Sequence, residues 1–340
     1  MAAAPWGRLL NGEPAAAEAA YARFAAQPVD WDRTAEADAP EAYPACQTTL
    51  GGPVAVTGPG TFFSGAQRTL WFRPARRYGW RFRRQDLKET LPIRVSVSTV
   101  WTTVRNIVLC SGSPHNYMRM VEHIIALRTG LGLDHLLIDV ASGDPPLFER
   151  GSADLVETAE RAGLERLPEP ARYVTAREPV TVLGERGSFL TLLPAAGGSR
   201  RLEVDCAIDF PNAIGRQRIR FTVTPAVFRE AAAARTNTTL WMMLLYRTVG
   251  LLFADMRNTG YNLRNILVAG PRRYLNRPRL VHNGKALEAV WHRAAMDLLA
   301  AVALIDRGRL AGTLLSYKSG HALDVRLVRA LYEQDLLAEL

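Results

Sequence analysis

The order of the predicted elements favours an α+β fold with two similar halves. Between residues 46 and 168, strand-like segments come first and helix-like segments follow, and the same order returns between residues 169 and 340. Pro168-Glu169-Pro170 lies at the junction, where two prolines in three residues prevent a helix from continuing. Strands followed by helices, twice over, predict two α+β domains at 46–168 and 169–340, preceded by an extension at 1–45.

In the first half, β-branched or alternating apolar residues predict strands at 48–50, 54–57, 68–74, 93–97, 105–109 and 136–140. Residues 121–127 carry apolar side chains at helical spacing, and Gly130 and Gly132 are suited to end that helix. A second helix is predicted at 154–162, where Gly163 ends it.

In the second half, the same patterns predict strands at 179–183, 189–193, 202–208 and 218–222, and a long helix at 284–305. The extension has helical character from Pro14 to Ala26, and a connector rich in proline and acidic residues follows it. We expect the extension to form an added helix that packs on the surface, or a partly ordered tail.

The formal net charge of +9 is carried almost wholly by arginine, because the only lysines are Lys88, Lys285 and Lys318. An arginine-rich surface favours anionic partners such as nucleotide phosphates, nucleic acid or membrane headgroups. No nucleic-acid recognition motif accompanies the charge, so we expect no nucleic-acid partner. Transient contact with an anionic membrane surface is compatible with it.

Neither the cysteines nor the apolar runs indicate secretion or a membrane span. The three cysteines, Cys46, Cys110 and Cys206, show neither metal spacing nor a pairing pattern, which indicates reduced thiols and a cytoplasmic location. The apolar run from Leu240 stops at Arg247, well short of the roughly 18 residues that a membrane-spanning helix needs.

Two stretches carry the candidate chemistry. Glu122-His123 places an acid and an imidazole at the start of the first predicted helix, about 100° apart around its axis, so the two side chains must serve separate roles. Near the C-terminus, residues 316–323 read Ser-Tyr-Lys-Ser-Gly-His-Ala-Leu. A buried histidine and a solvated glutamate would be the simplest interpretation of the first pair taken alone.

Together, and in this order, the two stretches resemble the UDP-3-O-acyl-N-acetylglucosamine deacetylase family, the zinc-dependent amidases of lipid A synthesis. That family reads roughly V-E-H-L-x-A-A-L-x-G-L-G-I-D-N and Y-K-S-G-H-A-L-N-N at the corresponding places. The turn Glu149-Arg150-Gly151-Ser152-Ala153 is similar to the family's M-D-G-S-A. The resemblance implies two β-α-α-β sandwich domains packed with the active site between them.

The resemblance also implies roles for particular residues. His123 would be the first ligand of a Zn²⁺ ion, and Glu122 the general base that takes a proton from water. His321 would steady the oxyanion and protonate the leaving amine, and the hydroxyl of Thr236, in the family's A-R-T motif, would hydrogen-bond that oxyanion. Lys318 matches a lysine that lies near the nucleotide's phosphates in the family. Arg293, whose charge would oppose a diphosphate, and Gly320 are further candidate substrate contacts.

The later helix departs from the family's H-K-x-x-D, which supplies the other two ligands. Here His292 is followed at i+4 by Met296, and Asp297 stands at i+5, about 140° further round a regular helix. Asp297 completes the metal set His123, His292 and Asp297 only if a π-bulge adds a residue to the turn. Ala294-Ala295 gives no reason for a bulge, so the local sequence favours a regular helix.

The predicted function is a zinc-dependent deacetylase that hydrolyses the N-acetyl amide of a UDP-3-O-acyl-N-acetylglucosamine-like substrate. The alternative is a catalytically silent homologue that binds the UDP-linked acylated amino sugar and regulates the pathway. We expect a monomer that binds one zinc per chain, more weakly than a complete three-ligand site would. The apolar stretch 240–254 falls where the family has a unit that forms the passage for the acyl chain.

Overall fold

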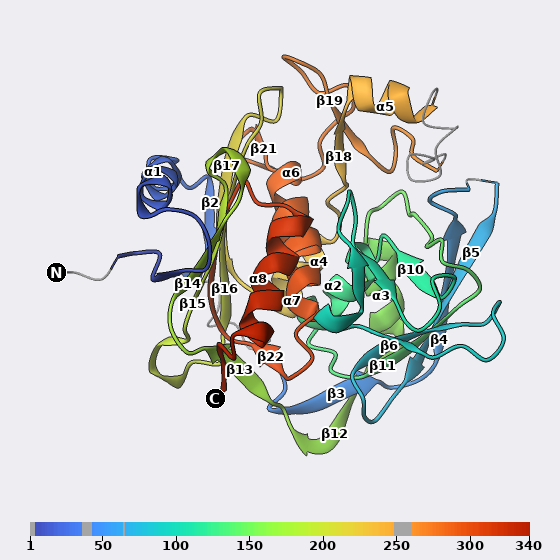
Figure 1. Ribbon diagram of the computed structural model, residues 1–340. Helices are drawn as coiled ribbons and strands as arrows, with labels where there is room; N and C mark the ends of the chain where they lie inside the picture. The colour runs from blue at the N-terminus through green and yellow to red at the C-terminus, as the bar shows by residue number, and fades with distance from the viewer. Residues whose placement is uncertain (1–3, 36–42, 64, 248–259) are drawn as a thin grey trace.

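The computed structural model describes residues 4–35, 43–63, 65–247 and 260–340 and shows a mixed α and β protein. Figure 1 shows two main sheets with helices between them, and the helix α1 (Pro14–Ala25) on the outer side of one sheet. The α+β class is thereby confirmed at this level. The finer arrangement into two β-α-α-β domains, and their boundaries, stay predictions.

The first main sheet has five strands in the order β4-β5-β11-β6-β7, and β11 pairs antiparallel with β5 and parallel with β6. Its strands are β4 (Val54–Pro59), β5 (Gln67–Pro74), β6 (Trp80–Arg84), β7 (Ile93–Arg94) and β11 (Leu136–Val140). The strand predicted at 93–97 ends early, because a 3₁₀ turn begins at Val97. The strand predicted at 105–109 begins instead at Val108, since Arg105 has φ 70° and leaves the extended region.

The second main sheet has seven strands in the order β1-β14-β15-β23-β16-β17-β2. Its strands are β1 (Arg8–Leu9), β2 (Trp31–Arg33), β14 (Val180–Leu183), β15 (Phe189–Leu193), β16 (Leu202–Asp209), β17 (Arg216–Thr222) and β23 (Gly312–Tyr317). Both edge strands come from the N-terminal extension, which therefore covers the two edges of this sheet.

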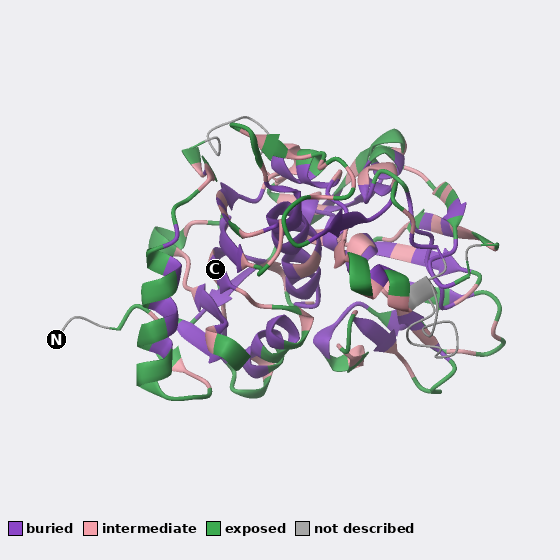
Figure 2. Ribbon diagram, turned by 90° about the horizontal axis from the view of Figure 1, so that it is seen from above, coloured by how far each residue is buried: buried purple, intermediate pink, exposed green. Residues whose placement is uncertain are grey.

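The helix of the extension binds the sheet through aromatic side chains. Tyr21 stacks on Phe189 of β15 at 4.2 Å between ring centroids, and Phe24 meets the same ring edge-on. The side chain of Asn11 exchanges two hydrogen bonds with the backbone of Leu183, each 2.8 Å long. Figure 2 shows the exposed and buried stripes of this helix, whose buried residues face the sheet.

The central helices share one hydrophobic core with both sheets. That core includes Phe72 of the five-stranded sheet, Ile125 and Leu299 of the helices, and Val204 of the seven-stranded sheet. The helices are α2 (Glu122–Gly130), α3 (Ala153–Ala162), α4 (Pro225–Ala231), α6 (Glu288–Trp291), a π-helical segment (His292–Leu298), α7 (Leu299–Ala303) and α8 (His321–Glu333). Figure 2 shows buried residues concentrated between the sheets.

Short strands and one further helix complete the described fold. Pro168 and Pro170 lie in β12, whose pairing with β3 shifts register between Arg166 and Pro170. The remaining elements are β3 (Cys46–Leu50), β12 (Leu164–Pro170), β8 (Val100–Thr102), β9 (Val108–Cys110), β10 (Tyr117–Arg119), β13 (Tyr173–Ala176), β22 (Arg309–Leu310), β24 (Leu337–Glu339), β18 (Asn237–Thr239), β19 (Leu267–Ala269), β20 (Val281–His282), β21 (Lys285–Ala286) and α5 (Leu240–Arg247). Of the predicted acyl-chain passage at 240–254, residues 248–254 lie outside the described residues.

Candidate active site

Two histidines and a threonine converge from three elements. His123 lies in the first turn of α2, His292 begins the π-helical segment, and Thr236 directly precedes β18. The Nε2 atoms of His123 and His292 are 3.3 Å apart, and the hydroxyl of Thr236 lies 3.2 Å and 3.0 Å from them. The fold thus brings together three residues that the sequence analysis assigned to one site.

A buried ion pair holds the segment that carries Thr236. Glu288, in the first turn of α6, accepts hydrogen bonds from the backbone N–H of Arg235 at 3.0 Å and from its Nε at 2.7 Å. Both side chains are almost fully buried. The backbone just before Thr236 is therefore fixed to the helix that leads directly into His292.

Ser152 orients the ring of His123, a role that the sequence analysis did not assign. Its Oγ lies 2.9 Å from Nδ1 of His123, and 3.1 Å from the sulfur of the buried Met296. When Nδ1 carries the ring proton and donates it to Ser152, the lone pair of Nε2 faces His292 and Thr236. The signal was the match of residues 149–153 to the family's turn, which was noted without a role for its serine.

The helix that carries His292 is not regular, and the expectation of a regular helix was wrong. Residues 292–298 are π-helical, so each turn holds an additional residue. Asp297 is thereby brought beside His292, with its Oδ1 3.7 Å from Nδ1 of that ring. Met296 packs against Ser152 and does not take the place of a ligand. Packing against neighbouring elements, which a local alanine pair does not reveal, decides this turn.

Glu122 and His321 form the second part of the site. Nε2 of His321, the first residue of α8, lies 3.6 Å from Oε1 of Glu122, which also accepts the backbone N–H of Ile107. Burial raises the pKa of the Glu122 carboxyl to about 7, although His321 opposes that rise. A carboxyl group with this pKa can exchange protons near neutral pH, as a general base must.

Burial and neighbouring charges shift the pKa values of the imidazoles in different directions. Burial lowers the pKa of His123 to about 3, and His292 adds to that shift. Burial also acts against a charge on His321, but the carboxylates of Asp297 and Glu122 outweigh it and raise the pKa of His321. The site therefore combines neutral imidazoles, suited to bind a metal, with one imidazole suited to carry a proton.

Several buried polar atoms of the site have no hydrogen-bond partner among the described residues. They are Oε2 of Glu122, Nδ1 of His321, and Nε and Nη1 of Arg293. Buried polar groups are nearly always paired, so an unpaired cluster at one place indicates a site that binds a further group. On α7, Ala300 and Ala301 have no polar side-chain atom that could pair with His321.

Of the residues predicted to contact the nucleotide, Gly320 lines an open cleft beside His321, whereas Lys318 and Arg293 are not among the lining residues of this cleft. Nη2 of the buried Arg293 donates to Asp324 and Ser319, which leaves only its Nε and Nη1 for the predicted phosphate. Lys318 is half-buried at the end of β23 with φ 51°. Gly320 and His321 line an open hollow of about 1370 Å³ that Asn11 and Gly12 of the extension also line.

The two histidines fit a metal ion, but the third ligand is not in place. Two atoms bound tetrahedrally to one zinc at about 2.0–2.1 Å lie about 3.3 Å apart, which agrees with the distance between the Nε2 atoms of His123 and His292. The carboxylate of Asp297 instead approaches Nδ1 of His292. Within the described residues, no three His, Cys, Asp or Glu side chains form a ready metal cluster.

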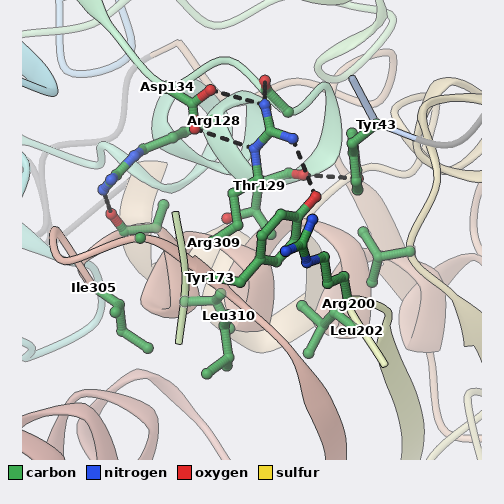
Figure 3. A pocket seen from close by; sticks show the side chains of 15 residues that line it. Tyr43, Arg128, Thr129, Asp134, Tyr173, Arg200, Leu202, Ile305, Arg309 and Leu310 are labelled. Carbon is green, nitrogen blue, oxygen red and sulfur yellow. Dashed lines mark hydrogen bonds and ion pairs between the residues drawn. The ribbon is translucent and has the colours of Figure 1, made fainter. Parts of the chain in front are cut away.

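A narrow pocket lies elsewhere, and none of the predicted site residues lines it. Figure 3 shows the side chains that line this pocket, Tyr43, Arg128, Tyr173 and Arg309 among them. Arg309 donates to Asp134, to the hydroxyl of Tyr173 and to backbone carbonyl groups. These hydrogen bonds link several segments of the surrounding chain.

The fold and this arrangement of acid, base and imidazole side chains define a hydrolase. The chain belongs to the UDP-3-O-acyl N-acetylglycosamine deacetylase family, whose sequence profile matches residues 47–333. The family suggested by the motifs is thereby confirmed. Because the match begins at residue 47, nearly all of the N-terminal extension lies outside it.

Two relatives with the name UDP-3-O-acyl-N-acetylglucosamine deacetylase illustrate the distance within the family. The protein of Cellvibrio japonicus (strain Ueda107) is 28% identical over 294 residues, which cover 85% of this chain and 90% of that protein. The protein of Thioalkalivibrio sulfidiphilus (strain HL-EbGR7) is 28% identical over 295 residues, with the same coverage. Over the described part of the chain, no helix has the length and apolar character needed to cross a membrane.

Proposed function

We propose that the protein is a zinc-dependent deacetylase that hydrolyses the N-acetyl amide of a UDP-3-O-acyl-N-acetylglucosamine-like substrate in the cytoplasm. The observation that carries the proposal is the 3.3 Å separation of two neutral imidazole nitrogens beside the buried Glu122–His321 pair. Family membership supports the reaction and the substrate class. The incomplete metal set would suit the silent homologue, but the presence of both the acid and the base group favours a deacetylase.

His123 and His292 would hold the zinc ion through their Nε2 atoms, and Asp297 is the carboxylate closest to completing that set. When bound, zinc supplies a Lewis acid that activates water near neutral pH and polarises the amide carbonyl. The protein's part is to keep both rings neutral by burial and to fix the His123 ring through Ser152.

Glu122 is the group that accepts a proton during the reaction, and His321 is the group that donates one. Glu122, with its Oε2 unpaired, accepts a proton from the attacking water. The protonated His321 donates to the leaving amine, and the hydroxyl of Thr236 donates a hydrogen bond to the oxyanion. All three groups lie on rigid elements or directly beside them, so little reorganisation is needed during the reaction.

The direct test is zinc content together with deacetylation. Protein purified gently at neutral pH is expected to contain one zinc per chain and to release acetate from UDP-3-O-acyl-N-acetylglucosamine. UDP alone is expected to bind at the cleft, in calorimetry, with Lys318 as a contact. No zinc after incubation with an excess, combined with retained UDP binding, would instead identify the silent homologue.

The pH dependence of kcat/KM is expected to be bell-shaped. Below about pH 7 the activity falls, because Glu122 becomes protonated and cannot accept a proton. At higher pH it falls again, once His321 loses its proton at its raised pKa. Initial rates between pH 5 and 10 check this. A rate that stays constant from pH 5 to 7 would contradict the role of Glu122.

Ser152→Ala is expected to weaken zinc binding by about 10–100-fold, as the loss of an outer hydrogen-bond partner usually does. The variant removes the group that lies 2.9 Å from Nδ1 of His123 but leaves every proposed ligand in place. Competition with a chelator measures the affinity. Ser142→Ala, which changes a serine outside this site, is the control and should bind zinc like the wild type.

A further inference from the structure

Arginines also gather at the opposite end of α2 from the candidate active site. Glu122 and His123 begin that helix, and Arg128 stands in its last turn. Around it lies a hollow of about 1020 Å³ that is open to solvent on one side. We name it the arginine groove, after the lining residues Arg76, Arg77, Arg94, Arg128, Arg172 and Arg307.

The carboxylates in the arginine groove do not balance these charges. Asp134 is bound in a fork by Arg309, which is not among the lining arginines, as Figure 3 shows. Asp306 accepts the hydroxyl of Tyr332 at 2.7 Å and pairs with Arg94 at 3.2 Å. Glu169 is the third and last carboxylate of the lining. The groove therefore keeps an excess of positive charge after its internal pairs are formed.

Three of the arginines lack a direct partner of opposite charge. The side chains of Arg77 and Arg172 form no hydrogen bond or ion pair with any residue that the structure describes. Arg128 is part-buried, and the one group to which its side chain donates in the described fold is the neutral backbone carbonyl of Ala303. Asp134 and Asp306 lie near enough to act on the charge of Arg128, but burial outweighs them and lowers its pKa. An anion that enters the groove and binds this guanidinium directly would therefore stabilise the charge.

A strained turn carries two of the lining residues of the groove, Arg77 and Tyr78. Tyr78 has φ 73°, which is rare for a residue other than glycine, and the residue is 59% exposed. The guanidinium groups of Arg77 and Arg81 lie 4.7 Å and 5.0 Å from the centre of its ring. Stacking of this kind fixes the plane of a guanidinium.

We propose that the arginine groove binds a phosphate-bearing anion through Arg77, Arg128 and Arg172. The planar guanidinium presents paired N–H donors that match two phosphate oxygens, and such charge-assisted bonds are among the strongest in proteins. The groove is separate from the proposed deacetylase site and does not depend on that activity. The anion can be a free phosphate compound or the headgroup of an anionic lipid.

The test compares two double variants that lose the same charge. Arg77→Ala/Arg172→Ala removes the two unpaired arginines of the groove, whereas Arg23→Ala/Arg161→Ala removes two exposed arginines from other surfaces. Calorimetric titration with pyrophosphate measures binding, and thermal unfolding verifies that each variant is folded. We expect saturable binding that weakens at least about tenfold in the first variant and stays unchanged in the second.

A second experiment distinguishes the two sources of the anion. Sedimentation with phosphatidylglycerol vesicles and with phosphatidylcholine vesicles is repeated for the same three proteins. Binding only to phosphatidylglycerol vesicles, lost in the groove variant, would assign the site to a lipid headgroup and uphold the proposal. Equal binding of pyrophosphate and of vesicles by both variants, or no binding by the wild type, would overturn it.

Discussion

Glu122→Gln is expected to lower kcat by about 10²–10⁴-fold, the usual contribution of a general base. Glutamine keeps the shape of the side chain and can still accept the backbone N–H of Ile107 through its amide oxygen. It cannot take a proton from water. Zinc binding should be almost unchanged, since Glu122 is not a proposed ligand, so the loss must appear in the rate and not in the metal content.

The thermal stability of Glu122→Gln provides a second test, because it depends on the burial of the Glu122 carboxyl group. The raised pKa of Glu122, about 7 against an ordinary value of 4.5, means that the folded protein binds this proton more tightly than the unfolded chain does. That contribution to stability is present at low pH and is lost between about pH 4.5 and 7. Metal-free Glu122→Gln is therefore expected to melt at a higher temperature than the wild type at pH 8. A lower melting temperature would contradict the burial argument.

The fold could be predicted where a strand or helix has its own periodicity. The structure agrees to within a residue with the predicted strands at 136–140 and 189–193 and with the predicted helix from Pro14. In these segments the local residue types, short β-branched runs or an alanine-rich stretch, are enough to determine the secondary structure. The edge strands β1 and β2 could not be found in this way. They have only two and three residues, and they are strands because the sheet provides partners.

In the candidate site, too, residues within local motifs could be predicted, whereas residues whose role depends on a tertiary contact could not. His123, Thr236 and His321 could be assigned because they stand in motifs with fixed neighbours. Asp324 could not, since its importance depends on the buried Arg293 that it binds, and Arg293 was assigned to the substrate. Ser152 was likewise hidden, because its partner His123 lies on another helix.

The π-helical turn is the clearest case of tertiary packing that the sequence did not reveal. Ala294 and Ala295 are fully buried, and their small side chains allow other elements to approach this helix closely. The widened turn lets Arg293 reach Asp324 while Met296 reaches Ser152 and Asp297 stays beside His292. A regular helix would turn Asp297 away from His292 by about 140°.

Asp297→Ala is expected to lower zinc affinity and deacetylation together, by at least about 10–100-fold, the loss typical of an outer partner of a metal ligand. The carboxylate lies 3.7 Å from His292 and 3.9 Å from His321, so its removal affects both the metal-binding ring and the proton donor. The loss will be larger still if the carboxylate turns to bind zinc itself. Chelator competition and initial rates measure the two quantities separately.

Variants of Met296 test whether the π-helical turn is what places Asp297, and not residue 296, at the zinc site. Met296 is fully buried beside Ser152, so Met296→Ala should cost about 2–5 kcal/mol of stability but leave zinc binding close to that of the wild type. Met296→Asp rebuilds the spacing His-x-x-x-Asp, which would strengthen zinc binding only on a regular helix. On the π-helical turn it places a carboxylate in the core, where it destabilises the protein without reaching the metal. Tighter zinc binding by Met296→Asp, with Asp297→Ala unaffected, would show that the turn is regular and that Asp297 has no part in the site.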